Sequence, residues 1–223
     1  MIRERIEEIS ASLPDGVRLC AVSKFHPATD IREAYDAGCR VFGESHVQEL
    51  VQKRDVLPDD IEWHFIGHLQ TNKVKYIAPF ISLIHAVDSP RLLREVSSQA
   101  LRNNRTIPCL LQLHVAREET KFGFAPEECL DYLRSGEYRQ LTGAAISGIM
   151  CIASNTDDEA RIRQDFAVAH DFFLQCKEEF PDLASQFCIK SWGMSGDYRL
   201  AIEQGSNMVR IGSSIFGPRN YQQ

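Results

Sequence analysis

Strand-like and helix-like segments alternate along the whole of this chain, and that alternation constrains the fold more than any other feature. Short apolar runs bounded by turn residues are typical of strands, above all when they are rich in β-branched and aromatic residues. Eight such runs occur, at 17–23, 40–42, 62–66, 81–87, 109–115, 146–152, 187–191 and 208–211.

Segments with helical spacing of apolar residues separate these runs. In the clearest of them, Ile162, Phe166, Ala169, Phe173 and Cys176 lie four, three, four and three residues apart, which places them on one helix face. Further helices are predicted at 2–13, 28–38, 47–51, 70–78, 92–100, 126–134 and 196–203.

The predicted fold is α/β: a single (β/α)₈ TIM barrel with an extra helix at the amino terminus. Strands that alternate with helices pair in parallel through right-handed crossovers. Eight such units close into a barrel, and strands covered on both faces are expected to be continuously apolar. An open doubly wound sheet is the alternative. No linker or low-complexity segment divides the chain, so we expect one domain over residues 1–223.

Composition argues against several classes of protein. Lysine plus arginine is 25 and aspartate plus glutamate is 31, a net charge of −6, whereas nucleic-acid proteins normally carry a basic stripe. No apolar run approaches the roughly 18 residues of a membrane span, and residues 1–8 lack an apolar signal core. The seven cysteines form no C-x-x-C pair, which favours reduced thiols over zinc. We therefore expect a cytoplasmic chain with no metal, nucleic-acid or membrane partner.

Lys24 is the first candidate functional residue. TIM barrels carry their active sites at the carboxyl ends of the strands, and Lys24 directly follows the apolar strand predicted at 17–23. A lysine on the surface is the commoner situation. A lysine desolvated at the barrel mouth would have a lowered pKa, and its free amine could attack a carbonyl group.

The two loops after the last predicted strands form a candidate phosphate site. TIM barrels often hold phosphate after strands seven and eight. Here Ser195 lies in a glycine-containing loop before a helix, and Gly212, Ser213 and Ser214 follow the last strand. Glycines let the backbone approach an anion, and helix starts offer free N–H groups. The alternative is that the serine is an N-cap and that the glycines are turn residues.

A lysine and a phosphate site together leave two classes of protein open. One is a Schiff-base aldolase for phosphorylated sugars, and the other is a protein that binds pyridoxal 5′-phosphate (PLP). His64 and His68 straddle a strand end and have no third metal ligand in view. For Glu44 and Glu49 we expect a solvated helix face rather than a role in the site.

Several motifs resemble the PLP homeostasis family, also called the YggS/PROSC family. The most specific are H-F-I-G-x-L-Q-x-N-K at 64–73 and G-M-S-x-D at 193–197. The matching segments occur in the family's order, at 21–24, 42–44, 47–49, 63–73, 121–124, 148–150, 193–197 and 209–217.

This resemblance implies a barrel of the alanine racemase N-terminal type, with PLP bound as a Schiff base on Lys24. It implies that Ser195, Gly212 and Ser213 hold the phosphate, with Met194 beside them. Arg210 would face the pyridine nitrogen. Because a guanidinium has no acceptor, it would keep that nitrogen unprotonated and weaken PLP as an electron sink.

The same resemblance implies a role in PLP homeostasis, without catalytic turnover, in which PLP is held and delivered to apo PLP-dependent enzymes. The alternative is an amino-acid racemase or related PLP enzyme. A racemase normally uses a second domain, and the chain ends about a dozen residues after the last predicted strand. We expect a monomer, since no large apolar surplus lies outside the predicted core faces. Ser45 stands where the family usually has asparagine, so the resemblance does not say whether position 45 contacts the cofactor region.

Overall fold

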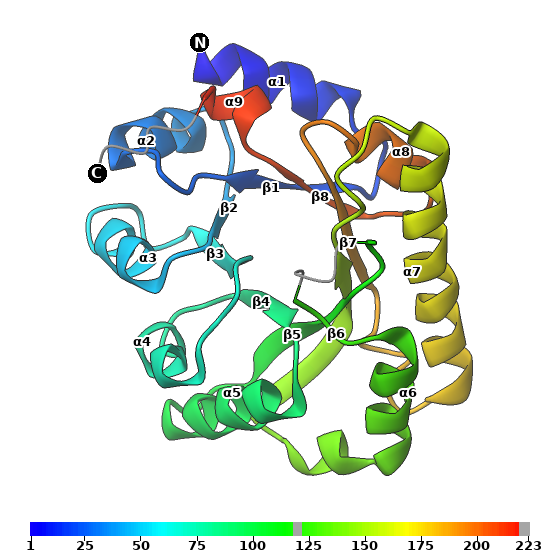
Figure 1. The fold of residues 1–223 in the computed structure, drawn as a ribbon. Helices are drawn as coiled ribbons and strands as arrows, with labels where there is room; N and C mark the ends of the chain where they lie inside the picture. The colour runs from blue at the N-terminus through cyan, green and yellow to red at the C-terminus, as the bar shows by residue number, and fades with distance from the viewer. Residues whose placement is uncertain (118–121, 219–223) are drawn as a thin grey trace.

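Eight parallel strands close into a barrel in the computed structural model, which describes residues 1–117 and 122–218 (Figure 1). The strands are β1 (Arg18–Val22), β2 (Val41–Glu44), β3 (Glu62–Phe65), β4 (Leu83–Val87), β5 (Ile107–Leu113), β6 (Ala144–Cys151), β7 (Ile189–Met194) and β8 (Met208–Ile211). Each strand pairs with the next along the chain, and β1 closes the barrel against β8, with Cys20 opposite Arg210. The TIM-barrel prediction is confirmed, and the open-sheet alternative is wrong.

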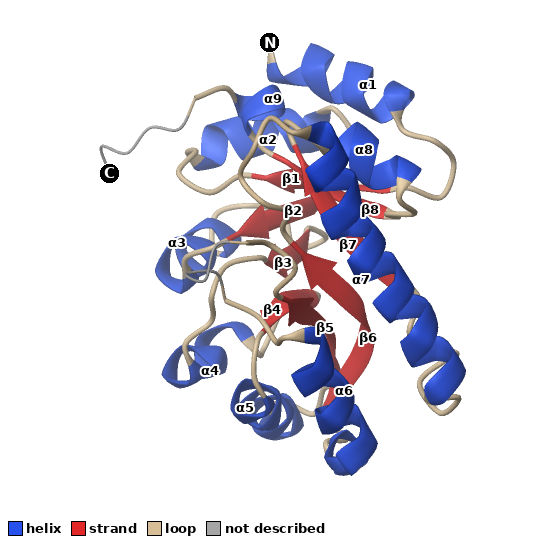
Figure 2. Cartoon of the chain, turned by 45° about the vertical axis from the view of Figure 1, so that its right-hand side comes forward, coloured by secondary structure: helices blue, strands red, loops and turns tan. Residues whose placement is uncertain are grey.

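Helices surround the barrel on its outside (Figures 1 and 2). They are α1 (Ile2–Ser12), α2 (Ala28–Asp36), α3 (Val47–Arg54), η1 (Thr71–Lys73), α4 (Val74–Ile77), α5 (Pro90–Arg102), α6 (Pro126–Ser135), η2 (Glu137–Gln140), α7 (Glu159–Glu179), α8 (Tyr198–Glu203) and α9 (Ser213–Phe216). The predicted extra amino-terminal helix is α1, which packs against α2 and α9. Within the described residues, no helix is both long and apolar enough to cross a membrane.

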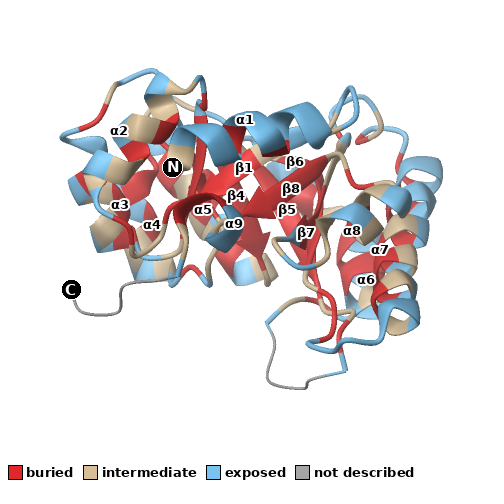
Figure 3. Ribbon diagram, turned by 90° about the horizontal axis from the view of Figure 1, so that it is seen from above, coloured by how far each residue is buried: buried red, intermediate tan, exposed pale blue. Residues whose placement is uncertain are grey.

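The main core lies between the strands and the inner faces of the helices, whose outer faces are exposed (Figure 3). From α7, the aromatic side chains of Phe166 and Phe173 are buried in it. A second cluster consists of strand residues alone and therefore fills the inside of the barrel: Leu83, Ala86, Leu110, Met150 and Met208. The barrel is thus packed with side chains rather than hollow.

Several predicted boundaries are wrong by two or three residues. The most consequential is that of β7, which runs to Met194 instead of ending at residue 191. Trp192, placed in a loop by prediction, is fully buried in the strand. Lys190 and Ser191 are polar and interrupt the apolar pattern of this strand. Ser191 is polar because its hydroxyl faces Arg210 inside the barrel. The helix predicted at 70–78 is instead a 3₁₀ turn followed by one short α-helical turn.

Candidate functional site

Lys24 lies in a tight turn directly after β1, as its position in the sequence predicts. The turn spans Ser23 to His26 and is closed by a hydrogen bond from the His26 N–H to the Ser23 carbonyl, 3.1 Å long. Phe25 has φ +66°, a value that bulky residues adopt rarely and at a cost of roughly 1–3 kcal/mol. Lys24 itself is half-buried. The neighbouring structure must therefore hold this turn in place.

A buried group of charged side chains lies beside that turn. Lys53 Nζ is 2.7 Å from Glu44 Oε1 and 2.7 Å from Glu49 Oε1, and it donates to the Ser23 carbonyl at 2.8 Å. The Ser23 hydroxyl donates to the same Glu44 oxygen, at 2.6 Å. Glu44 is completely buried, and this burial raises the pKa of its carboxyl to about 7, against the opposing effect of Lys53.

Sequence reasoning missed this charged group, and the expectation that Glu44 and Glu49 lie on a solvated helix face is wrong. Glu44 is the last residue of β2. It therefore lies at the carboxyl end of a barrel strand, the end that carries the active site in TIM barrels. The Glu49 side chain is only 22% exposed. One signal was available: Glu49 and Lys53 are four residues apart, the spacing of a helix ion pair.

Arg210 is a buried cation held inside the barrel. It lies on β8 and is only 4% exposed. Its Nη1 donates to the carbonyl and the hydroxyl of Ser191, at 2.6 and 2.7 Å, and its Nη2 donates to the Cys151 carbonyl at 2.9 Å. Burial lowers the pKa of the guanidinium, but arginine stays charged in proteins.

Two histidines extend this polar group across the barrel. His85 Nδ1 lies 2.9 Å from the Ser191 hydroxyl, and His85 Nε2 lies 2.9 Å from His64 Nδ1. Both rings are buried, and burial lowers the pKa of His64 to about 3 and that of His85 well below its ordinary value. The rings are therefore neutral at pH 7. Sequence reasoning weighed His64 only as a metal ligand and missed this role.

The predicted phosphate-binding residues come together at the ends of β7 and β8. The Ser195 hydroxyl accepts the N–H of Gly212 at 3.2 Å, which joins the two loops. The first hydrogen bond of α9 runs from the Ile215 N–H to the Gly212 carbonyl, so the N–H group of Ser213 lies ahead of it at the helix start. Met194 ends β7 with its side chain 40% exposed. A Cβ on Gly212 would come within 3.1 Å of the Val22 carbonyl oxygen at the end of β1.

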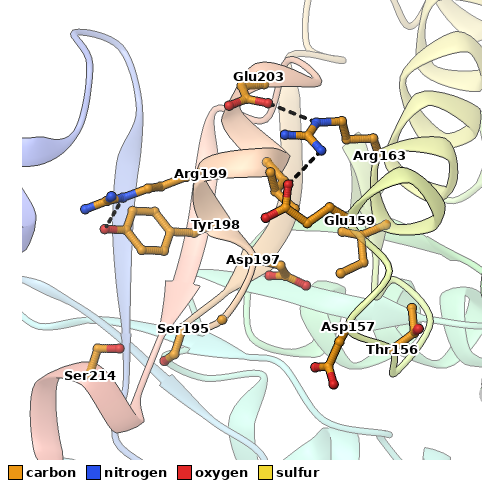
Figure 4. Close-up of a pocket in the computed structure, with 13 residues that line it drawn as sticks. Thr156, Asp157, Glu159, Arg163, Ser195, Asp197, Tyr198, Arg199, Glu203 and Ser214 are labelled. Atoms are coloured by element: carbon orange, nitrogen blue, oxygen red, sulfur yellow. Dashed lines mark hydrogen bonds and ion pairs between the residues drawn. The ribbon is translucent and has the colours of Figure 1, made fainter.

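A cavity of about 760 Å³ adjoins these loops (Figure 4). Its walls come from the start of α7, the loop between β7 and α8, α8 itself and α9, and Ser195 and Ser214 lie on one side of it. Arg163 pairs with Glu159 at 2.9 Å and with Glu203 at 3.2 Å on the opposite side. The serine-bearing loops are therefore reachable from outside the barrel.

The other predicted candidates are dispersed. His68 lies away from His64, with its ring stacked 3.9 Å from that of Phe122 and its Nδ1 2.8 Å from Asp88. Ser45 places its hydroxyl 3.1 Å from His46 Nδ1. In residues 1–117 and 122–218, no three His, Cys, Asp or Glu side chains are grouped as a metal would require. Of the family-like segment at 121–124, Lys121 lies outside the described residues.

Comparison with known proteins gives one consistent family. Residues 1–220 match the family "Alanine racemase, N-terminal domain". The pyridoxal phosphate homeostasis protein of Pasteurella multocida is 38% identical over 210 residues, covering 93% of this chain and 88% of that protein. PipY of Synechococcus elongatus, solved without PLP, superposes with a TM-score of 0.91 at 36% identity, covering 97% of this chain and all of that one. PipY with PLP bound gives 0.88 at 35% identity, with the same coverage.

Proposed function

The chain belongs to the family of pyridoxal phosphate homeostasis proteins, and from that membership we propose that it binds PLP through Lys24 and takes part in PLP homeostasis. The observation that carries the proposal is the placement of three chemically matched groups on the adjoining strands β1 and β8 and on the loops that follow β7 and β8. Lys24 follows β1, Arg210 lies on β8, and Ser195 hydrogen-bonds to Gly212 just after β8. These groups suit, respectively, the aldehyde, the ring nitrogen and the phosphate of PLP.

The loops after β7 and β8 suit a phosphate dianion. The Ser195 hydroxyl accepts the Gly212 N–H and keeps its own O–H to donate. The backbone N–H groups of Gly212 and Ser213 lie at the start of α9, where negative charge is favoured. In this proposal the Gly212 N–H exchanges its bond to Ser195 for one to the phosphate. Gly212 lies so close to the end of β1 that a side chain there would crowd Val22. In this proposal Met194, at the end of β7, is the apolar neighbour of the cofactor.

Arg210 suits the pyridine nitrogen of PLP. Its Nη atoms are engaged with β6 and β7, and no hydrogen bond of these three uses its Nε. A guanidinium donates hydrogen bonds and accepts none, so the ring nitrogen that it contacts stays unprotonated. PLP bound in this way is a weaker electron sink than PLP with a protonated ring nitrogen.

Lys24 suits the aldehyde. Its amine forms a covalent C=N bond with the aldehyde carbon, and one water molecule is released; addition of water reverses the reaction. A reversible bond keeps a reactive aldehyde away from other amines and allows its delivery to apo PLP-dependent enzymes. We include in the proposal that this occurs without catalytic turnover, in a single domain over residues 1–223, of which 118–121 and 219–223 lie outside the described residues.

We also propose that the chain acts as a monomer. In the described part of the chain, the large apolar side chains that are exposed belong to several different elements and loops around the barrel: Val56, Tyr76, Leu101, Phe122, Val168, Leu174 and Met194, with Met1 at the amino terminus. A stable dimer usually buries a contiguous apolar patch.

Borohydride reduction tests the central residue. The purified protein, mixed with PLP, should show imine absorbance, and reduction should add the mass of the reduced cofactor to the peptide that contains Lys24. Lys24→Ala should abolish both signals. Lys75→Ala is the matched control, because Lys75 is exposed on α4. Imine absorbance and label retained in Lys24→Ala would refute the assignment.

A further inference from the structure

The two peptide groups on either side of Lys24 are both held by side chains of α3. On one side, the Ser23 carbonyl accepts a hydrogen bond from Lys53 Nζ at 2.8 Å. On the other side, the Phe25 N–H donates to Glu49 Oε1 at 2.6 Å. Lys53 and Glu49 are joined to each other by an ion pair of 2.7 Å. Two residues of one helix thus fix the backbone before and after the lysine.

Lys53 has no free hydrogen-bonding capacity left. A lysine ammonium has three N–H donors, and Lys53 Nζ has three acceptors within 2.8 Å, namely Ser23, Glu44 and Glu49. Its side chain is only 8% exposed. A saturated ammonium between two carboxylates is a poor nucleophile, so Lys53 is not a second attachment point for an aldehyde.

The conformation of Phe25 explains why such a brace is required. A positive φ at the third position of a four-residue turn is usually provided by glycine or asparagine, and here a phenylalanine adopts +66°. Left without support, the turn would relax and take Lys24 with it. The hydrogen bond to Glu49 is charge-assisted and short, the kind that opposes such relaxation best.

We propose that Glu49 and Lys53 are positioning residues that hold the Lys24 turn, so that the Lys24 amine meets the aldehyde in one fixed orientation. This inference rests on the proposed function, since it concerns the same lysine. Glu49 Oε1 accepts both from Phe25 and from Lys53, and a glutamine carbonyl oxygen can accept the same two bonds without the charge. Glu49→Gln therefore keeps the two hydrogen bonds and removes the charge, whereas Glu49→Ala removes both. Comparing the two variants separates the effect of the hydrogen bonds from the effect of the charge.

The experiment compares Glu49→Ala with Glu49→Gln in the full chain. Stopped-flow absorbance measures the rate at which PLP forms its bond with the protein, and binding of pyridoxine 5′-phosphate, which lacks the aldehyde, measures retention by the phosphate and ring contacts alone. Loss of one charge-assisted hydrogen bond should slow bond formation about tenfold in Glu49→Ala. Glu49→Gln should stay within about threefold of the parent, and pyridoxine 5′-phosphate affinity should be unchanged in both.

Matched controls keep this result interpretable. Gln52→Ala removes an exposed side chain from the same helix and should leave both readouts unchanged. Lys53→Met removes the other half of the brace but leaves Glu44 buried without its cation, so the milder Glu49 pair carries the test. Borohydride reduction should label Lys24 in every variant, which shows that the same lysine still reacts. Failure to label Lys24 in the parent protein would refute the proposed function and not the positioning role of Glu49 and Lys53.

Three outcomes would overturn the brace. A normal rate in Glu49→Ala shows that the turn holds itself. A rate in Glu49→Gln as slow as in Glu49→Ala assigns the effect to charge rather than to backbone positioning. A loss of pyridoxine 5′-phosphate affinity as large as the loss of rate with PLP shows a general collapse of the site.

Discussion

Replacing His64 by asparagine should remove part of the acid sensitivity of this protein. His64 contacts its buried partner His85 through Nδ1, 2.9 Å away, and the asparagine amide places a polar atom near the position of Nδ1. The amide can thus keep the hydrogen bond but cannot titrate. A difference in pH dependence between the two proteins therefore reports the loss of this ring, together with its smaller effect on the pKa of His85.

The sign follows from where the proton binds. Burial lowers the pKa of His64 to about 3 in the folded protein, whereas an unfolded histidine has a pKa of about 6.5. Between these values the unfolded state binds more protons, so stability is lost as the pH falls. Each pH unit is worth about 1.4 kcal/mol, so the ring should cost the folded protein about 2 kcal/mol between pH 7 and pH 5.

Glu44 changes stability in the opposite direction over part of this range. Burial raises the pKa of its carboxyl from 4.5 to about 7. Between these two pH values the folded state binds more protons than the unfolded state, so the free energy of unfolding decreases as the pH rises. Both proteins contain Glu44, and its contribution cancels when the two are compared.

Urea unfolding at pH 7 and pH 5 measures the effect. The stability of the parent protein relative to His64→Asn should fall by about 2 kcal/mol between the two values. Parallel pH dependence of parent and His64→Asn would refute the argument that this ring is kept neutral by burial.

Two further predictions concern the cofactor. Ser195→Ala and Arg210→Gln should each weaken PLP retention in equilibrium dialysis, by roughly tenfold for one hydrogen bond to a charged group, and unchanged affinity in both would contradict the proposed phosphate and ring contacts. Amino-acid racemase assays on the PLP-loaded protein should give background rates by chiral chromatography, whereas robust turnover would favour the alternative that this is a PLP enzyme.

The order of elements could be predicted from the sequence because each strand is a short apolar run between turn residues. The prediction was least accurate where a strand carries inward polar residues. In β7, Ser191 faces Arg210 and His85 inside the barrel, so a buried strand has a polar residue in its middle. Apolar periodicity does not distinguish such a position from the end of a strand.

The candidate residues could be placed at one end of the barrel because strand order alone determines which loops share that end. The side chains that support the lysine turn could be predicted only as far as the four-residue spacing of Glu49 and Lys53, which is typical of a helix ion pair. Lys53 is far from Ser23 in sequence, and its burial depends on α3 packing over the end of β1. A charged residue on a helix is usually solvated, so only the three-dimensional structure shows that this one is enclosed.

The pairing of β1 with β8 has a consequence for how the protein folds. The lysine turn follows β1, Arg210 lies on β8, and Gly212 directly follows β8. The groups that would hold one small molecule therefore come from opposite ends of the described chain. They become neighbours only when the ring of strands is joined. A ligand that contacts all of them therefore stabilises the pairing of β1 with β8. Its binding selects chains whose last strand has docked, and adds to their stability by mass action.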